Sequence, residues 1–453
     1  MTDESSAPIE ALRSEGDLNF SPRRRRWAEE QIDPETRSIL DEDSKYFLHQ
    51  SLSTPCLDVL TGARGATLID HQGREILDFH GNNVHQVGFG HPKVIEAIKD
   101  QLDELPFCPR RYTNEKAIEL AKRLTQLAPG DLNKVLFAPG GAEAIGIALK
   151  LARLKTGRHK TISMWDSFHG ASLDAISIGG EAIFRRGIGP LLPGCEHVPP
   201  PNPTDCPFEC GHDCNLRCAK YIEYILEKEG DVAAVIGETM RSVPYVPPPD
   251  YWKTVRAACD RYGALLILDE IPTGLGRTGK MFVCEHYDIV PDILVIGKGL
   301  GGGIFPLAAI LARQGLEVGG HIALGHFTHE KSPVGAAAAL AMLDVIAEEG
   351  LLDRAHDLGT YFKQGLEQLR LKHPCIAEIR GIGLFLGVRI VDPNNPLKSD
   401  PDRAEAILYE SLSRGLNFKT TMGHTLTLTP PLTIRREEID RALEILDAAI
   451  SAT

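Results

Sequence analysis

Short apolar runs alternate with amphipathic stretches through the middle of the chain. Apolar residues recur at helical spacing over residues 94–105 and 115–127, which predicts two helices there. The apolar runs beyond these stretches have the length of buried strands. Strands that alternate with helices predict an α/β fold with a largely parallel sheet covered on both faces, and ligands then gather at the carboxyl ends of the strands. The predicted strands lie at residues 134–137, 161–164, 232–237, 264–268, 293–296 and 306–312.

The two ends of the chain follow other patterns. Residues 65–78 alternate as in a β-hairpin, with a turn near residues 71–73. After Pro333, an alanine-rich helical stretch leads to further strands and a closing helix. We therefore expect an N-terminal tail with a small β-containing segment, a large ligand-binding domain and a smaller C-terminal α/β domain. These parts are residues 1–85, 86–332 and 333–453.

Composition and charge narrow the functional classes. The chain has 453 residues, 43% of them apolar, and a net charge of −13, so it can bury a large core and is a poor match for nucleic acid. No apolar run approaches the roughly 20 residues of a membrane span, and the polar residues 1–21 lack the apolar core of a signal peptide. We therefore expect a flexible tail and a cytoplasmic protein. The basic cluster at residues 23–26 beside Trp27 predicts a solvated arm or a contact with a partner subunit.

A lysine and an aspartate follow two of the predicted strands. Lys298 ends an apolar run and is followed at once by glycines, and Asp269 ends the previous run, about one βαβ step earlier. A lysine at such a strand end can be desolvated and react with a carbonyl, while a nearby carboxylate can keep a pyridinium nitrogen protonated. A snorkelling lysine and a loop aspartate are the ordinary alternative for each residue alone. Together, the two residues predict a Schiff-base lysine and a charge partner for pyridoxal phosphate.

Four of the ten cysteines recur at every fourth position. They are Cys206, Cys210, Cys214 and Cys218, and His212 lies among them. Such a group could hold a structural zinc, although zinc-binding cysteines usually come in closer pairs. The alternative is a surface insertion whose thiols stay reduced or pair fortuitously, and we assign no metal.

The order of these motifs resembles the signature of the class III aminotransferase family, whose members are pyridoxal-phosphate enzymes of fold type I. The resemblance is carried by residues 269–282, by residues 291–293 and by the lysine with its glycines at residues 297–303. It extends from about Gly65 to about Leu446. The resemblance implies a large domain with a mostly parallel sheet flanked by helices, a smaller α/β domain, and a homodimer with shared active sites.

The resemblance also implies where the cofactor is held. A glycine pair between a strand and a helix matches the family's phosphate loop, where backbone N–H groups at the helix N-terminus bind the anion. The family usually has Ser-Gly there, whereas this chain has Gly140 and Gly141. In the family an aromatic residue stacks on the ring, a glutamate and an isoleucine lie near it, and a threonine reaches the phosphate of the neighbouring subunit. The cofactor-binding residues by this match are Gly141, Ala142, Phe168, Glu238, Asp269, Ile271, Lys298 and Thr328.

Three departures from the family pattern bear on the reaction. Many members carry an arginine that pairs with the substrate carboxylate at the position of Thr427, and losing such a bidentate pair weakens carboxylate binding severely. Amine transaminases use an arginine just upstream, where this chain has Lys419. Pro272 stands where the family usually has a glutamine near the ring hydroxyl. The chain thus lacks an evident device for a carboxylate-bearing amino acceptor, which an elimination would not need.

Arginines and asparagines elsewhere predict the substrate. Arg111 lies in a segment that resembles the phospholyases of the family, and Arg241 lies just beyond the predicted glutamate. Arginines suit a phosphonate dianion, although both residues could instead form surface ion pairs. Asn82 and Asn83 lie in a polar segment that could bind a substrate hydroxyl.

The expected activity follows from these residues and from the resemblance. We expect a lyase that uses pyridoxal phosphate to remove water and ammonia from a 2-hydroxy amine bearing a phosphonate, leaving an aldehyde. Lys298 and Asp269 are the predicted catalytic residues, and His169 is left out because a loop histidine before a glycine is more often structural. The alternatives are an ω-amine aminotransferase and a non-catalytic protein of the same fold.

Overall fold

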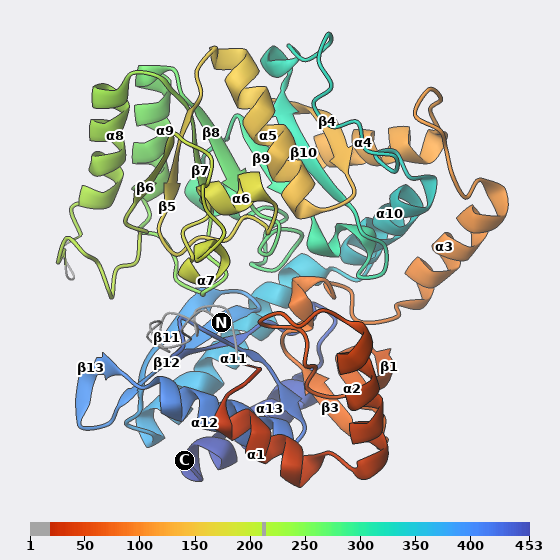
Figure 1. The fold of residues 1–453 in the computed structure, drawn as a ribbon, viewed down its shortest axis with the longest axis vertical. Helices are drawn as coiled ribbons and strands as arrows, with labels where there is room; N and C mark the ends of the chain where they lie inside the picture. The colour runs from red at the N-terminus through yellow and green to blue at the C-terminus, as the bar shows by residue number, and fades with distance from the viewer. Residues whose placement is uncertain (1–18, 211–213) are drawn as a thin grey trace. The chain divides into compact units, whose positions relative to one another are not determined.

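The computed structural model describes residues 19–210 and 214–453, which divide into two compact units (Figure 1). One unit is the continuous segment Pro92–Leu352, and the other combines the residues up to His91 with Asp353–Thr453. The helix that follows Pro333 belongs to the Pro92–Leu352 unit, and the N-terminal strands belong with the C-terminal residues. The three-part division expected from the sequence stays a prediction.

A seven-stranded sheet forms the centre of the Pro92–Leu352 unit. Its order is β4-β10-β9-β8-β7-β5-β6, and all pairs from β9 to β6 are parallel. Only β10 is antiparallel to its neighbours, so the predicted largely parallel sheet is confirmed with one reversed strand among the described residues. The strands are β4 (Leu132–Ala138), β5 (Lys160–Met164), β6 (Cys195–Val198), β7 (Val232–Glu238), β8 (Leu265–Asp269), β9 (Ile293–Ile296) and β10 (Ala308–Arg313).

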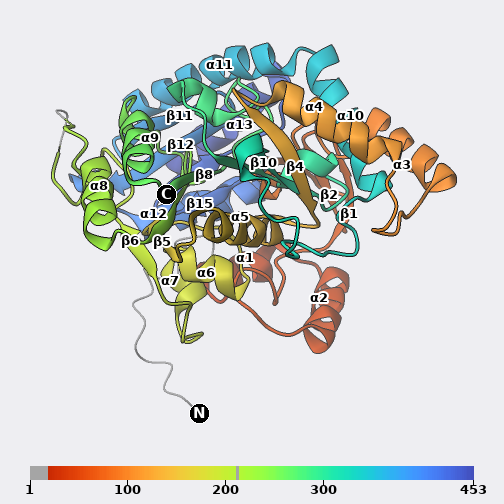
Figure 2. The same cartoon turned by 90° about the horizontal axis from the view of Figure 1, so that it is seen from above.

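Helices cover both faces of this sheet. Figure 2 shows α5 and α6 on one side and α4 and α9 on the other. Alanine, isoleucine and leucine side chains of α5 join the strands in one buried cluster, and each large apolar side chain buried there stabilises the fold by about 1.5–3 kcal/mol. This packing fixes the N-terminus of α5 against the strand ends. The helices are α3 (Pro92–Glu104), α4 (Glu115–Leu127), α5 (Gly141–Thr156), α6 (Leu173–Ile178), α7 (Ala182–Arg185), α8 (Arg217–Glu229), α9 (Tyr251–Tyr262) and α10 (Pro333–Glu348), with the 3-10 turns η3 (Val283–Tyr287), η4 (Lys298–Gly301) and η5 (Gln314–Leu316).

The other unit contains two sheets. The first has the order β1-β2-β3-β14, and its β2–β3 hairpin is the one predicted from the sequence. The second has the order β11-β12-β16-β15 and is antiparallel, with β13 paired to β12. The elements are β1 (Leu60–Arg64), β2 (Thr67–Asp70), β3 (Glu75–Asp78), η2 (Gly81–Asn83), α11 (Leu351–Lys372), β11 (Ile376–Ile382), β12 (Phe385–Asp392), β13 (Asn395–Ser399), α12 (Pro401–Ser413), β14 (Leu416–Asn417), β15 (Lys419–Thr421), β16 (Thr425–Leu428) and α13 (Arg436–Ser451).

Two helices that the sequence did not predict precede the first sheet, α1 (Pro22–Gln31) and α2 (Pro34–Tyr46). The expected tail falls mostly on residues 1–18, which lie outside the described residues. Its last residue does not fit that expectation, because Ser21 is buried and its side chain caps α1.

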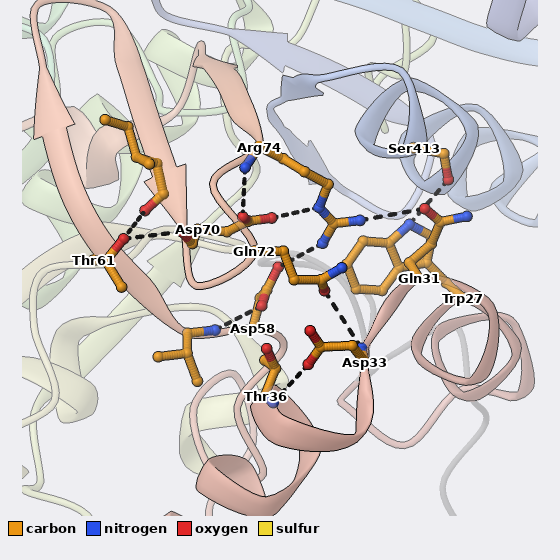
Figure 3. Close-up of polar contacts among 12 residues, drawn as sticks. Trp27, Gln31, Asp33, Thr36, Asp58, Thr61, Asp70, Gln72, Arg74 and Ser413 are labelled. Atoms are coloured by element: carbon orange, nitrogen blue, oxygen red, sulfur yellow. Dashed lines mark hydrogen bonds and ion pairs between the residues drawn. The ribbon is translucent and has the colours of Figure 1, made fainter.

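The basic cluster at residues 23–26 lies within α1. Trp27 beside it is buried against Tyr409 of α12, and its indole N–H donates to Ser413 Oγ at 3.1 Å (Figure 3). Arg24 is buried as well and donates to the carbonyl of Pro55 at 2.8 Å. The expected solvated arm is therefore wrong for these two residues, because the indole ring buries its apolar area within the same unit.

An ion-pair cluster fixes the turn of the β2–β3 hairpin to the segments before it. Arg74 donates to the buried Asp70, to Asp58 at 3.2 Å and to Gln31 of α1 at 3.3 Å (Figure 3). Burial raises the pKa of Asp58, and the guanidinium opposes that effect. A planar guanidinium can serve several acceptors at once, so one side chain holds three segments together.

The four regularly spaced cysteines carry free thiols. Cys206, Cys210 and Cys214 are partly exposed, whereas Cys218 lies in α8, where burial raises the pKa of its thiol to about 12. His212 lies outside the described residues. Among residues 19–210 and 214–453, no three side chains of His, Cys, Asp or Glu form a group that could hold a metal ion, and no helix is long and apolar enough to cross a membrane.

Candidate active site

The carboxyl ends of β7, β8 and β9 bring three of the predicted residues to one edge of the large sheet. Glu238 lies opposite Asp269 in the parallel β7–β8 ladder, and Asp269 lies opposite Val295 of β9. Lys298 follows β9 and is the first residue of η4. Because parallel strands end at the same edge, the lysine and both carboxylates are grouped there.

Lys298 begins its turn with a backbone conformation that is rare for a residue with a side chain. Its φ is +47°, in the left-handed region, which costs on the order of 1–3 kcal/mol and persists only where packing enforces it. A Cβ on the preceding Gly297 would lie 3.2 Å from Cβ of Ala308, so the chain runs close against β10 at this point. The rest of η4 is buried, while Lys298 is partly exposed. The lysine amine therefore starts from a fixed backbone and can still reach a ligand.

Asp269 is 1% exposed, and both of its carboxylate oxygens have partners. Oδ2 lies 2.7 Å from Nδ1 of His169, and Oδ1 accepts a hydrogen bond from the N–H of Ile271 at 3.0 Å. With Nδ1 protonated, the imidazole donates to the carboxylate and holds its orientation. His169 is buried too, and its Nε2 has no hydrogen-bond partner among the described residues. His169 was not among the catalytic residues predicted from the sequence. The sequence signal for a role in the site was its place in the loop after β5.

The turn between β4 and α5 leaves the N-terminus of a 16-residue helix without a side-chain cap. A Cβ on Gly141 would lie 2.8 Å from Cδ1 of Ile271, and one on Gly170 would lie 2.7 Å from Cβ of Ala142. Gly170 also has a φ of +127°, so glycine is required where its segment approaches Ala142, while Gly141 leaves room for the Ile271 side chain. The uncapped N–H groups and the helix dipole suit a phosphate, which backbone groups would hold without the hydroxyl that the family usually supplies.

Phe168 follows β5 and belongs to a pair of aromatic rings. Its ring centroid lies 4.5 Å from that of Phe184 in α7. The N–H of Phe168 donates to Glu238 Oε1 at 3.2 Å, which connects the loop after β5 to the end of β7. Burial raises the pKa of the Glu238 carboxyl, and the charge of Arg241 opposes this shift.

Arg241 lies inside an ion-pair network and not on a surface. It is 5% exposed, and its Nη2 donates to Glu181 Oε1 at 2.6 Å. Its Nε lies 3.8 Å from Glu238 Oε2. The surface ion pair considered for this residue is thus replaced by a buried one, and the two buried carboxylates offset the attraction of the guanidinium for a substrate dianion.

Glu270 is as buried as the neighbouring Asp269, and both of its carboxylate oxygens accept hydrogen bonds. It accepts hydrogen bonds from the N–H groups of Val283 and Cys284 at 2.6 and 2.8 Å and from the Thr239 hydroxyl at 2.8 Å. Burial nevertheless raises the pKa of this carboxyl to about 7. These contacts fasten η3 to the ends of β7 and β8, which is a structural role that the sequence did not reveal.

Arg111 and Thr328 lie on exposed segments of the same unit. The segment of Arg111 contacts the residues that follow Thr328 at two points, one before Arg111 and one after it. The rings of Phe107 and His329 lie 5.2 Å apart, and the side chain of Asn114 donates to the carbonyl of Lys331 at 3.0 Å. Asn114 also caps α4. The structure thus brings the segment of Arg111, a predicted substrate residue, against the segment of Thr328, a predicted cofactor residue. The two segments are far apart in the sequence.

Thr427 and the two asparagines belong to the other unit. Thr427 is 3% exposed, its hydroxyl lies 2.8 Å from that of Thr421, and Lys419 is opposite it on β15. Where many relatives carry an arginine, this chain therefore has a buried threonine whose hydroxyl is hydrogen-bonded. Asn82 and Asn83 form the turn η2 with left-handed φ values of +46° and +58°. Asn83 is buried, while Asn82 and Lys419 line one cavity of about 280 Å³.

Comparisons with known proteins agree with this arrangement. A model of the family described as "Aminotransferase class-III" matches residues 49–450. The chain is 47% identical to the (R)-1-hydroxy-2-aminoethylphosphonate ammonia-lyase of Vibrio splendidus (strain 12B01), over 97% of this chain and 95% of that protein. It is 38% identical to the acetylornithine aminotransferase of Caldanaerobacter subterraneus subsp. tengcongensis, over 91% of this chain and 99% of that protein.

A solved structure gives the same result for the fold. An amine transaminase from an uncultivated Pseudomonas species, in its PLP-bound form, superposes with a TM-score of 0.81 and 30% sequence identity, covering 90% of this chain and 98% of that one. The fold type I architecture predicted from the sequence is thereby confirmed. On the matching family model and these relatives, the chain belongs to the class III aminotransferase family.

Proposed function

We propose that this protein is a pyridoxal-phosphate-dependent ammonia-lyase that acts on a 2-hydroxy amine bearing a phosphonate, such as (R)-1-hydroxy-2-aminoethylphosphonate. The observation that carries the proposal is the 47% identity, over almost the whole chain, to the Vibrio splendidus enzyme of that name. Thr427 supports it, because a buried and hydrogen-bonded threonine supplies no charge for the carboxylate of an amino acceptor.

The residues at the strand ends fit pyridoxal phosphate. When bound, the cofactor supplies an aldehyde that condenses with amines and a cationic ring that accepts electrons. Lys298 would carry it through its amine, and Asp269 would keep the ring nitrogen protonated. The N–H groups at Gly141 and Ala142 would hold the phosphate, because that helix N-terminus has no side-chain cap. Phe168 and Ile271 would pack against the ring, and Glu238 accepts the hydrogen bond that holds the backbone of Phe168.

The same residues support an elimination. With the substrate amine held by the cofactor, the Lys298 amine would be the base that removes the proton from the carbon that bears nitrogen. The electron pair left behind would expel hydroxide from the neighbouring carbon, and the Lys298 ammonium would give its proton to the leaving oxygen, so that water leaves. Hydrolysis of the released enamine consumes one water, so the net change is loss of ammonia and formation of a phosphonate-bearing aldehyde. No oxo acid is needed.

Arg111 is the residue that we assign to the phosphonate, because it is exposed and carries a fork of donors that suits a dianion. Asn82 and Asn83 are assigned to the substrate hydroxyl. Asn83 supports this with a buried side-chain oxygen that has no hydrogen-bond partner among the described residues. A buried polar atom without a protein partner needs a water molecule or a ligand group to bind it, and a substrate hydroxyl can fill that place.

We also infer a homodimer with shared active sites. Thr328 matches the family residue that reaches the phosphate in the neighbouring subunit. Because the segment of Arg111 is fastened to that of Thr328, both residues would serve the same active site of the partner. A cytoplasmic location stays a prediction, to which the ten free thiols are suited.

A product assay tests the reaction directly. The holoenzyme is given the phosphonate-bearing 2-hydroxy amine without any oxo acid, and ammonia and aldehyde are measured over time. Many turnovers per active site, with both products in equal amounts, support the lyase. If turnover begins only when pyruvate or 2-oxoglutarate is added, and alanine or glutamate accumulates, the protein is an aminotransferase instead.

A further inference from the structure

The network around Arg241 connects two segments that come together at the aromatic pair. Glu181 directly precedes α7, which carries Phe184, and its carboxylate accepts a hydrogen bond from Arg241 at 2.6 Å. Glu238 ends β7, and its two oxygens accept hydrogen bonds from the N–H groups of Phe168 and Ser242 at 3.2 Å each. The guanidinium of Arg241 therefore contacts two carboxylates. Glu238 anchors the backbone of Phe168, and Glu181 lies at the start of the helix that carries Phe184.

Backbone contacts reinforce the same connection. The N–H of Gly180 donates to the carbonyl of Ser167 at 2.8 Å, so the residues just before Glu181 and Phe168 are hydrogen-bonded to each other. A Cβ on Gly180 would lie 2.3 Å from the carbonyl oxygen of Met164, which shows how closely the α7 segment passes over the end of β5. Ion pair, backbone bond and ring contact thus form one rigid assembly around Phe168.

The burial of the three charged side chains makes the ion pair indispensable for this assembly. The side chains of Arg241, Glu181 and Glu238 are 5%, 1% and 4% exposed. Removing the Arg241 guanidinium would take away the positive charge that both buried carboxylates contact, so the α7 segment would move to hydrate them. Phe184 would then leave its contact with Phe168.

We propose that Arg241 is a positioning residue, which holds Phe168 and Phe184 together through Glu238 and Glu181 and so fixes the ring surface on which the cofactor rests. The proposal rests on the assignment of Phe168 to the cofactor under the proposed function. It replaces the expectation that Arg241 binds the substrate phosphonate. Phe184 becomes, on the same reasoning, part of the wall of the cofactor site.

Replacing Arg241 and measuring kcat and KM with two substrates distinguishes a positioning role from a substrate-binding role. Arg241→Lys keeps one positive charge but loses the fork that joins two carboxylates. We expect kcat to fall about 10-fold for the phosphonate substrate and for a 2-hydroxy amine without phosphonate alike, the upper effect of losing an aromatic pair. The circular dichroism induced in bound pyridoxal phosphate should weaken as well. A KM that rises at least 10-fold for the phosphonate substrate alone would overturn the proposal.

Phe184→Leu tests the same idea without touching a buried charge. It should lower kcat and the induced circular dichroism as Arg241→Lys does, and the double variant should lose no more than the stronger single one, because both act through Phe168. Unchanged kcat and dichroism in Phe184→Leu would overturn the proposal even if the arginine variant failed to fold.

A matched control is available at the opposite edge of the sheet. Arg256 donates to Asp292 at 2.7 Å in another partly buried ion pair, next to the start of β9. Arg256→Lys should lower thermal stability but leave the dichroism of the bound cofactor unchanged. The dichroism readout does not depend on the reaction type, so an aminotransferase result in the product assay would reject the lyase and leave this test intact.

Discussion

Nδ1 of His169 lies 2.7 Å from Oδ2 of Asp269, and both side chains are almost fully buried. The contact joins the loop after β5 to the end of β8, two segments that are distant in sequence. It gives the aspartate one fixed orientation, while the N–H of Ile271 holds the other oxygen. An aspartate that must hold a proton on a ring nitrogen benefits from this arrangement, because preorganised charge needs no reorientation during the reaction.

Replacing this histidine should destabilise the fold and impair catalysis together. His169→Phe removes the donor to a buried carboxylate, and a hydrogen bond to a charged group contributes about 1.5–3 kcal/mol. We expect a loss of that size in the free energy of unfolding, measured by urea titration, together with a lower kcat. His197→Phe is the control, because His197 contacts Trp165 and the carbonyl of Gly179 and does not contact Asp269. Equal stability of His169→Phe and the wild type would contradict the assigned contact.

Lys298→Ala should abolish covalent attachment of pyridoxal phosphate while the fold is retained. Turnover should drop at least ~10²–10⁴-fold, the range supplied by a positioned acid or base. Borohydride reduction followed by peptide mass spectrometry identifies the modified lysine in the wild type. Lys280→Ala, at an exposed lysine near the same signature segment, serves as the control and should keep full activity. Cofactor found on any other lysine would refute the assignment.

Asp269→Asn should still bind pyridoxal phosphate but turn over at least ~10²-fold more slowly. The amide keeps the shape of the carboxylate but not its charge, so the ring nitrogen loses the group that keeps it protonated. Absorption spectra and single-turnover rates with the amine substrate provide the measurement. A variant within tenfold of the wild type would mean that another group protonates the ring.

Arg111→Ala should raise KM for the phosphonate substrate by about 10- to 100-fold and leave KM for a phosphonate-free amine unchanged, because only the dianion loses a charged partner. Lys122→Ala, at an exposed lysine in α4, controls for the loss of surface charge. If Arg111 serves the neighbouring subunit, mixing Arg111→Ala with Lys298→Ala subunits should restore part of the activity. Mixed dimers without any recovery would place Arg111 in the active site of its own subunit.

Glu270 should make the protein less stable as the pH rises from about 4.5 to about 7. Its pKa is raised by burial from an ordinary value of 4.5 to about 7, so over this interval the unfolded chain releases a proton that the folded chain retains. The free energy of unfolding should therefore fall by roughly 3 kcal/mol across that window and stay level above it. Glu270→Gln should remove this fall in urea titrations between pH 5 and 8, whereas the exposed Glu119→Gln should not. An unchanged pH slope in Glu270→Gln would contradict the prediction.

Periodicity predicted the elements with strong local signals. The helices at α3 and α4 and the strands at β7, β8 and β9 could be read from apolar spacing, because these segments bury one face or both faces continuously. The short β6 and the two N-terminal helices were missed. The apolar side of α1 consists of little more than Trp27, and its burial depends on Tyr409, almost the whole chain away.

The sequence by itself determined the cofactor chemistry of this protein, because a lysine and an aspartate at the ends of neighbouring strands need only the local strand-and-turn pattern to be recognised. It also identified Thr427 as a departure from the family. Only the tertiary structure decided that His169 holds Asp269, that Arg241 is enclosed by Glu181 and Glu238, and that the segments of Arg111 and Thr328 are fastened together. The physical reason is that burial and pairing of charged groups depend on residues distant in the chain, and spacing along a single sequence carries no record of them.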